Sequence, residues 1–139
     1  MREKVLRISP AEKDAILEKL AGAIAGQEEI LFAYVFGSFS EDAPFHDIDV
    51  GIYLSGTDPA AALRSGAETA LRLEQALRYP VDVSVLNSAP LPFLFHVIRG
   101  LPIFARDEDL RAEIVEQTVR RYLDIKPLLL RGTREAFAA

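Results

Sequence analysis

Two aspartates one residue apart, Asp47 and Asp49, follow a Gly37-Ser38 pair with eight residues between Ser38 and Asp47. Apolar residues alternate with the aspartates, so we expect both carboxylates on one face of a strand at 47–54. Two carboxylates on one face offer the hard oxygen ligands that Mg²⁺ prefers. The Gly37-Ser38 turn can present backbone N–H groups and a hydroxyl to phosphate oxygens. Together these features predict metal-assisted phosphoryl transfer.

A third acid, Asp82, lies in a valine-rich run at residues 81–86. Strand alternation places its neighbouring valines on one face and Asp82 on the other. In a two-metal site the ions lie about 4 Å apart, and more than two carboxylates are needed to hold them. We expect Asp47 and Asp49 to bridge both ions, and Asp82 to complete the site and accept the proton of an attacking hydroxyl. Three crowded anions are costly without a cation, which itself argues for metal.

The same residues leave weaker interpretations open. An Asp-x-Asp pair alone is common in solvated loops, Gly37-Ser38 also suits a plain turn, and Asp82 suits an ordinary edge strand. His46 either contacts a phosphate or is a solvent-facing loop residue. His96 stands among apolar residues, where we expect a core or interface histidine. The spacing of the glycine, the serine and the three acids together favours the metal site.

Alternating helical and strand patterns are expected to position these residues. We expect strands at residues 30–36, 47–54, 81–86 and 101–105. We expect helices from a capping box at Ser9 to Gly26, from residue 59 to just before Pro80, at residues 92–99, and from Asp107 onward, with Pro127 kinking or ending the last one. This order predicts one domain over residues 1–139 with an α/β (α+β) fold. Helices would cover one face of a small mixed sheet, and the acids on the other face would line a cleft.

The composition excludes several classes of function. The absence of cysteine removes disulfides, thiol catalysis and Cys-ligated zinc. A net charge of −5 argues against stable nucleic-acid binding, though not against nucleotides, because Mg²⁺ brings compensating charge. No apolar run approaches the roughly 20 residues that span a bilayer, and the N-terminus lacks a signal-peptide pattern. We therefore expect a cytoplasmic protein without a membrane partner.

Basic residues gather near the C-terminus. They are Arg120, Arg121, Lys126, Arg131 and Arg134. Their ordinary interpretation is a solvated helix face, and the alternative is a surface that docks a partner or faces phosphate.

The segment from Val35 to Val50 resembles the signature of the DNA polymerase β-type nucleotidyltransferase superfamily: an apolar residue, Gly-Ser, a loop, then Asp-apolar-Asp-apolar. Asp82 stands at the place of that superfamily's third acid. At this size the chain is similar to the minimal nucleotidyltransferases called MNT proteins. More narrowly, it resembles MntA-type adenylyltransferase antitoxins, which pair with HEPN-domain toxins. Two departures are visible: the eight-residue loop is shorter than the antitoxin pattern, and His46 stands where serine is usual.

The resemblance implies a polymerase β-type fold and an antitoxin enzyme that uses two Mg²⁺ ions. Such an enzyme would transfer AMP from ATP to a tyrosine hydroxyl of a cognate HEPN ribonuclease toxin. Asp47, Asp49 and Asp82 would be the metal-binding and catalytic residues, and Gly37 and Ser38 would hold the triphosphate. Two alternatives stay open: an antitoxin that masks its partner by binding alone, and a small-molecule enzyme resembling aminoglycoside adenylyltransferases. A homo- or hetero-oligomer is compatible with each.

Overall fold

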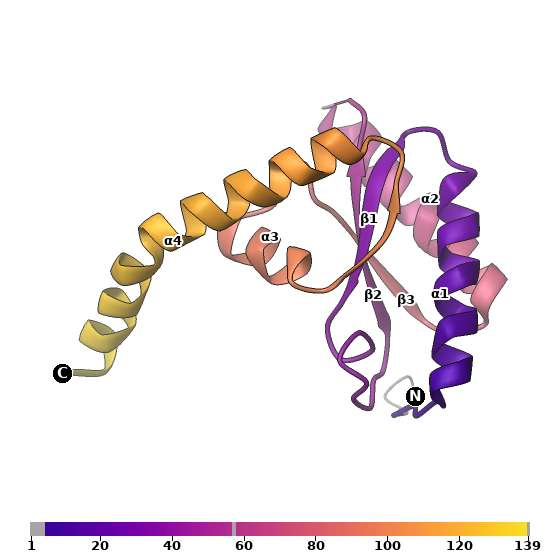
Figure 1. Cartoon of the computed structure of the whole chain (residues 1–139), viewed down its shortest axis with the longest axis horizontal. Coiled ribbons are helices and arrows are strands. Elements are labelled where there is room, and N and C mark those ends of the chain that lie inside the picture. The colour runs from indigo at the N-terminus through magenta and orange to yellow at the C-terminus, as the bar shows by residue number, and fades with distance from the viewer. Residues whose placement is uncertain (1–4, 57, 139) are drawn as a thin grey trace.

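A four-stranded mixed sheet forms the centre of the molecule (Figure 1). The computed structural model describes residues 5–56 and 58–138, and side chains as far as residue 132. The strands are β1 (Ile30–Phe36), β2 (Ile48–Leu54), β3 (Val81–Val85) and β4 (Leu101–Ala105), in the spatial order β3-β2-β1-β4. Strand β1 is antiparallel to β2 and β4, whereas β3 runs parallel to β2. The predicted α/β class with a small mixed sheet is confirmed.

The helices begin where the sequence places their caps. They are α1 (Pro10–Ala25), α2 (Pro59–Leu77), α3 (Leu91–Ile98) and α4 (Glu108–Ala138). Ser9 and Glu12 form the expected capping box, with the Ser9 hydroxyl accepting from the Glu12 N–H at 3.1 Å. The Asp107 carboxylate accepts the backbone N–H of Leu110 at 3.0 Å. These contacts satisfy N–H groups that have no partner inside the helix.

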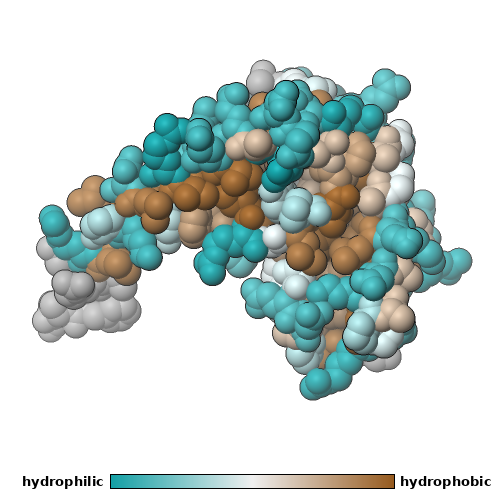
Figure 2. Space-filling view, viewed as in Figure 1, coloured by the Kyte–Doolittle hydropathy of each residue, from teal (hydrophilic) through white to brown (hydrophobic). Residues whose placement is uncertain are grey.

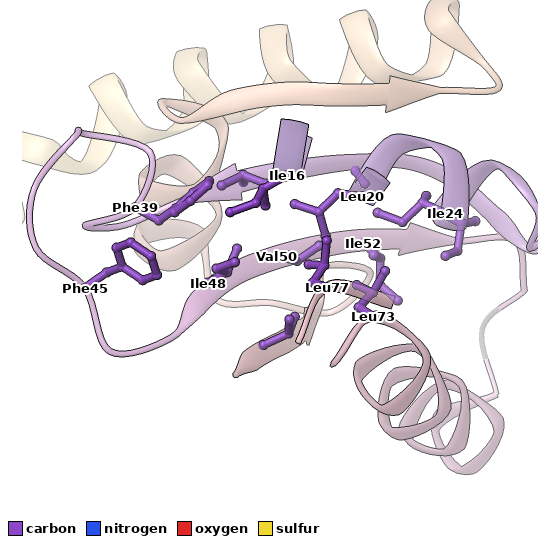
Figure 3. Packing of buried hydrophobic residues seen from close by; sticks show 14 of the residues in the cluster. Ile16, Leu20, Ile24, Phe39, Phe45, Ile48, Val50, Ile52, Leu73 and Leu77 are labelled. Atoms are coloured by element: carbon purple, nitrogen blue, oxygen red, sulfur yellow. The ribbon is translucent and has the colours of Figure 1, made fainter. Parts of the chain in front are cut away.

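One face of the sheet is covered by α1 and α2. The alternate residues of β2 that point to this face are wholly or almost wholly buried, as strand alternation requires. They pack against apolar residues of both helices (Figure 3): Ile48, Val50, Ile52 and Leu54 against Ile16, Leu20, Ile24, Leu73 and Leu77. Burying one such side chain contributes roughly 1.5–3 kcal/mol, so this face provides much of the driving force for folding.

The other face of the sheet is covered by α3 and the first half of α4. Phe32, Tyr34 and Phe36 of β1 point to this face, where Val97 of α3 is fully buried. Gly51 makes room for α3, because a Cβ at Gly51 would lie 2.9 Å from a Val97 methyl. The helices therefore lie on both faces of the sheet rather than on one. The physical reason is β1 itself, which is apolar at every position and needs cover on both sides.

Helix α4 extends well beyond the sheet and forms an arm (Figure 1). Pro127 lies inside this helix instead of ending it. Past Tyr122, which stacks on Phe95 with ring centroids 3.9 Å apart, the arm exposes the large side chains of Leu123 and of residues 128–130. An apolar strip runs along the arm (Figure 2). The side chain of Arg134, the last of the basic cluster, lies outside the described residues.

No helix in the ranges described above is both long and apolar enough to cross a membrane.

Candidate active site

The three acids predicted from the sequence lie on adjacent strands of the sheet. Asp49 of β2 is directly paired with Asp82 of the parallel strand β3. Paired residues of neighbouring strands project from the same face, so both carboxylates lie on the face that carries α3. Asp47 immediately precedes β2 and stands two residues from Asp49. Asp47 and Asp82 are exposed, whereas Asp49 is half-buried between them.

Electrostatics at Asp49 reflect this crowding. Burial of the carboxyl group and the negative charges of Asp82 and then Asp47 raise the pKa of Asp49 to about 6. His96 acts in the opposite direction and lowers it. The carboxylates are therefore close enough to repel one another, and a positive charge among them is favourable. This is the electrostatic environment that binds a divalent cation.

Gly37 ends β1 directly beside Asp49. Gly37 lies beside Asp49 because the residue before it, Phe36, pairs with Asp49 in the antiparallel ladder. Gly37 has a φ of +78°, a conformation that side chains disfavour. A Cβ at this position would also collide with the Asp49 carboxylate. Glycine is thus required twice, once for the turn and once to let the carboxylate lie against the backbone.

Ser38 opens the hydrogen-bonded turn at residues 38–42 that follows Gly37. Its carbonyl accepts the N–H groups of Glu41 and Ala43, each at 3.1 Å, and the Ser40 hydroxyl donates to the Gly37 carbonyl at 2.7 Å. Within the part of the chain that the structure describes, the N–H and the hydroxyl of Ser38 donate to no protein acceptor. Ser38 is also exposed. Its donors are therefore available to a phosphate at this turn.

The loop between β1 and β2 is short but firmly anchored. Phe39 and Phe45 are buried in the core, with ring centroids 5.0 Å apart in an edge-to-face arrangement (Figure 3). Lys13 of α1 donates to the Asp42 carboxylate at 2.6 Å and to the Ser40 carbonyl at 3.0 Å. Only 13% of the Lys13 side chain is exposed. This anchoring holds Gly37 and Ser38 in place relative to the acids.

His96 and Arg99 were not among the predicted site residues, yet α3 places both at this end of the sheet. A cavity of about 290 Å³ is lined by Gly37, Ser40, Glu41, His96 and Arg99, together with Phe36, Gly100 and Leu101. The expectation of a core histidine at position 96 is wrong, because the side chain is exposed and acts on Asp49, and the alternative of an interface histidine stays a prediction. The position of α3 depends on packing against β1, which no local pattern in α3 reveals.

The donor set suits Mg²⁺ bound together with a nucleotide. Among the described residues, no three His, Cys, Asp or Glu side chains form a ready cluster for a metal ion. Mg²⁺ is commonly held by one or two carboxylates, with substrate phosphates and water completing its shell. Asp49 and its neighbours Asp47 and Asp82 supply hard oxygen ligands, and their mutual repulsion is relieved by a cation. The residues present therefore fit the ion that the chemistry requires.

A fold with these acids beside a glycine turn defines a nucleotidyltransferase, and comparison with known families agrees. The family described as "Polymerase beta, Nucleotidyltransferase" matches residues 18–109, which contain all four strands and every predicted site residue. The chain belongs to this family. No curated protein sequence matches it significantly.

Solved structures of MNT antitoxin complexes share the fold. A chain of the complex of tri-AMPylated Shewanella oneidensis HEPN toxin with MNT antitoxin is 22% identical, with a TM-score of 0.62 over 89% of this chain and 93% of that chain. A toxin–antitoxin structure with AMP-PNP is also 22% identical, with a TM-score of 0.63 over 86% of this chain and 93% of that chain. A chain of the MntA–HepT complex gives 22% identity and a TM-score of 0.55, covering 92% of this chain and 94% of that chain. This chain therefore shares the fold of the chains in these toxin–antitoxin complexes.

Proposed function

We propose that the chain is an Mg²⁺-dependent protein adenylyltransferase, which transfers AMP from ATP to a tyrosine hydroxyl of a cognate HEPN-domain toxin and so acts as an antitoxin. The observation that carries the proposal is the direct pairing of Asp49 with Asp82 next to the Gly37 turn. That arrangement supports the proposal, because carboxylates that could bind a metal ion and accept a proton lie beside a turn that could bind phosphate. We place the protein in the cytoplasm, where ATP is abundant.

Each site residue has a distinct role in this reaction. Asp47 and Asp49 would hold two Mg²⁺ ions, which neutralise the charge of the triphosphate. Ser38 and the backbone at Gly37 orient the phosphates through hydrogen bonds. Asp82, which is exposed at the edge strand β3, faces an incoming acceptor and takes the proton of its hydroxyl. The acceptor oxygen then bonds to the α-phosphorus, the bond from that phosphorus to the bridging oxygen breaks, and pyrophosphate leaves.

A protein acceptor is favoured by the relatives and by the α4 arm. The structural neighbours include a chain from the complex of a tri-AMPylated HEPN toxin with MNT antitoxin, and a chain from a toxin–antitoxin structure with AMP-PNP. In this chain, α4 exposes leucines between basic residues beyond the point where it leaves the sheet. An exposed apolar strip with basic neighbours is a surface that a second protein can cover.

Neutralisation by binding alone is the second candidate, and the same α4 arm favours it, because docking by the arm needs no chemistry. The two candidates differ in what remains after separation. A HEPN protein encoded in an adjacent reading frame is incubated with this chain, ATP and Mg²⁺, then separated from it and assayed for ribonuclease activity. The adenylyltransferase proposal expects durable loss of activity that requires ATP. Full recovery after separation, with or without ATP, would instead establish masking.

A further inference from the structure

The segment that cradles the phosphates contains no strong cation of its own. Residues 37–46 include Glu41 and Asp42, no lysine or arginine, and a single histidine, His46. Lys13 approaches this segment from α1, but its ammonium group is engaged by the Asp42 carboxylate at 2.6 Å and by the Ser40 carbonyl at 3.0 Å. A nucleoside triphosphate carries several negative charges, and charge-assisted hydrogen bonds from basic side chains strengthen the binding of phosphate oxygens. Basic side chains from elsewhere in the fold can supply such bonds.

Helix α3 and the residue that caps it bring two basic side chains to this place. His96 and Arg99 line the cavity of about 290 Å³ whose opposite wall is formed by Gly37 and Ser40. The volume lies near the lower end of the range for ligand pockets, roughly 300–1,000 Å³. Gly37 lines the cavity, and the Asp49 carboxylate lies against Gly37 without lining the cavity itself. The cavity is therefore next to Asp49. It therefore adjoins the metal-binding acids at the end of the turn where phosphates are held.

Close packing keeps both side chains in position. Gly100 lies so near β1 that a Cβ there would be 3.0 Å from the Phe36 Cα and would also collide with the Val35 carbonyl. Arg99, the residue before it, is thereby held at the end of β1, with its guanidinium 5.6 Å from the centroid of the Phe95 ring. The His96 ring packs edge-to-face on Phe36, with centroids 5.5 Å apart. These contacts place both basic side chains at the end of the sheet where Gly37 lies, while their polar ends stay exposed.

We propose that the cavity between α3 and the Gly37 turn is a subsite for the terminal phosphates of the nucleotide and for the departing pyrophosphate, with Arg99 and His96 as its binding residues. Arg99 supplies a permanent positive charge and a planar set of donors suited to phosphate oxygens. His96 adds a ring N–H donor on the side nearest Asp49. The inference rests on the proposed nucleotidyl transfer and names which groups hold the leaving group.

Glu41 is the informative exception in the lining, because its carboxylate opposes an anion. If the subsite binds phosphates, removal of this charge should strengthen binding, while removal of the Arg99 charge should weaken it. Arg72 offers a matched control. It is an exposed arginine on α2, and α2 packs against the opposite face of the sheet.

The test measures binding without any acceptor protein. Isothermal titration calorimetry with Mg²⁺ compares AMP-PNP, inorganic tripolyphosphate and AMP for the wild type and for Arg99→Gln, His96→Gln, Glu41→Gln and Arg72→Gln. We expect Arg99→Gln to weaken AMP-PNP and tripolyphosphate about tenfold or more, with AMP changed less than about twofold. His96→Gln should do the same to a smaller extent, Glu41→Gln should tighten both polyphosphates, and Arg72→Gln should change nothing.

Two results would overturn the subsite. One is an Arg99→Gln variant that binds both polyphosphates as tightly as the wild type. The other is an equal loss for AMP and AMP-PNP, which would place Arg99 elsewhere on the nucleotide. Thermal unfolding of each variant excludes misfolding, since the replaced side chains are exposed. The two proposals fail separately: a chain that binds polyphosphate as predicted but modifies no toxin keeps this subsite and loses the antitoxin proposal.

Discussion

Replacing Asp49 by asparagine is expected to stabilise the metal-free protein at neutral pH, although the same change removes a metal ligand. Burial and the charges of Asp82 and Asp47 raise the pKa of Asp49 from 3.8 to about 6. A raised pKa means that the fold favours the protonated carboxyl group. Ionised Asp49 therefore lowers the free energy of unfolding. This loss starts as the pH rises above 3.8 and is complete above about 6.

The magnitude follows from the shift. A difference of about two pKa units corresponds to roughly 3 kcal/mol at 1.36 kcal/mol per unit, which is an upper limit. Because Asp49 is only half-buried, solvent screening reduces this figure, and we expect about 1 kcal/mol. For a domain of this size such a gain raises the melting temperature by about 3 °C. Asparagine has nearly the same shape as aspartate, so little packing is lost.

Circular dichroism melts in chelator measure this effect. At pH 7.5 we expect Asp49→Asn to melt about 3 °C above the wild type. Below pH 3.8 the gap should close, because Asp49 is then largely protonated in both the folded and the unfolded protein. Asp14→Asn, at an exposed position on α1, is the matched control and should show no such gap. Added Mg²⁺ should stabilise the wild type more than Asp49→Asn. A variant that melts below the wild type at pH 7.5, or a gap independent of pH, would refute the reasoning.

Three further predictions concern transfer and docking. Asp47→Asn combined with Asp49→Asn should abolish Mg²⁺-dependent nucleotide transfer while the fold survives; a retained rate, or equal transfer by the wild type in excess chelator, would remove these acids from the metal site. Ser38→Ala should weaken ATP use roughly 10- to 100-fold at subsaturating ATP, from the loss of one or two charge-assisted hydrogen bonds, and an unaltered rate would place the phosphate contacts elsewhere. Leu123→Asp with Leu130→Asp, at positions 56% and 52% exposed, should weaken toxin binding at least tenfold in a pull-down titration without changing AMP-PNP affinity, and unchanged toxin binding would exclude the arm as the docking surface.

The neighbourhood of Asp49 and Asp82 could be predicted from the sequence because strand patterns repeat every two residues. Valines alternating with Asp82, and apolar residues alternating with Asp49, indicate one shared polar face. The structure pairs these two residues directly. What no pattern of this kind specifies is the metal geometry, so the roles of Asp47, Asp49 and Asp82 as ligands stay predictions.

His96 was misjudged because its position depends on contacts far apart in the sequence. The run from Phe93 to Ile98 is apolar except for the histidine, which suggests a buried helix. In the fold α3 buries Val97 against the sheet and leaves His96 exposed, and Gly100 just after α3 approaches β1 closely. The helices on the second face were also unexpected. Their signal was present in β1, whose residues are apolar on both faces.

The most direct test of the central claim is the intact mass of the toxin after treatment. A purified HEPN toxin is incubated with ATP, Mg²⁺ and either the wild type or Asp82→Asn, and is then separated and weighed by mass spectrometry. The wild type should add whole AMP units to tyrosine, whereas Asp82→Asn should still bind the toxin and add none. An unmodified toxin after wild-type treatment, or equal modification by Asp82→Asn, would contradict adenylyl transfer by these three acids.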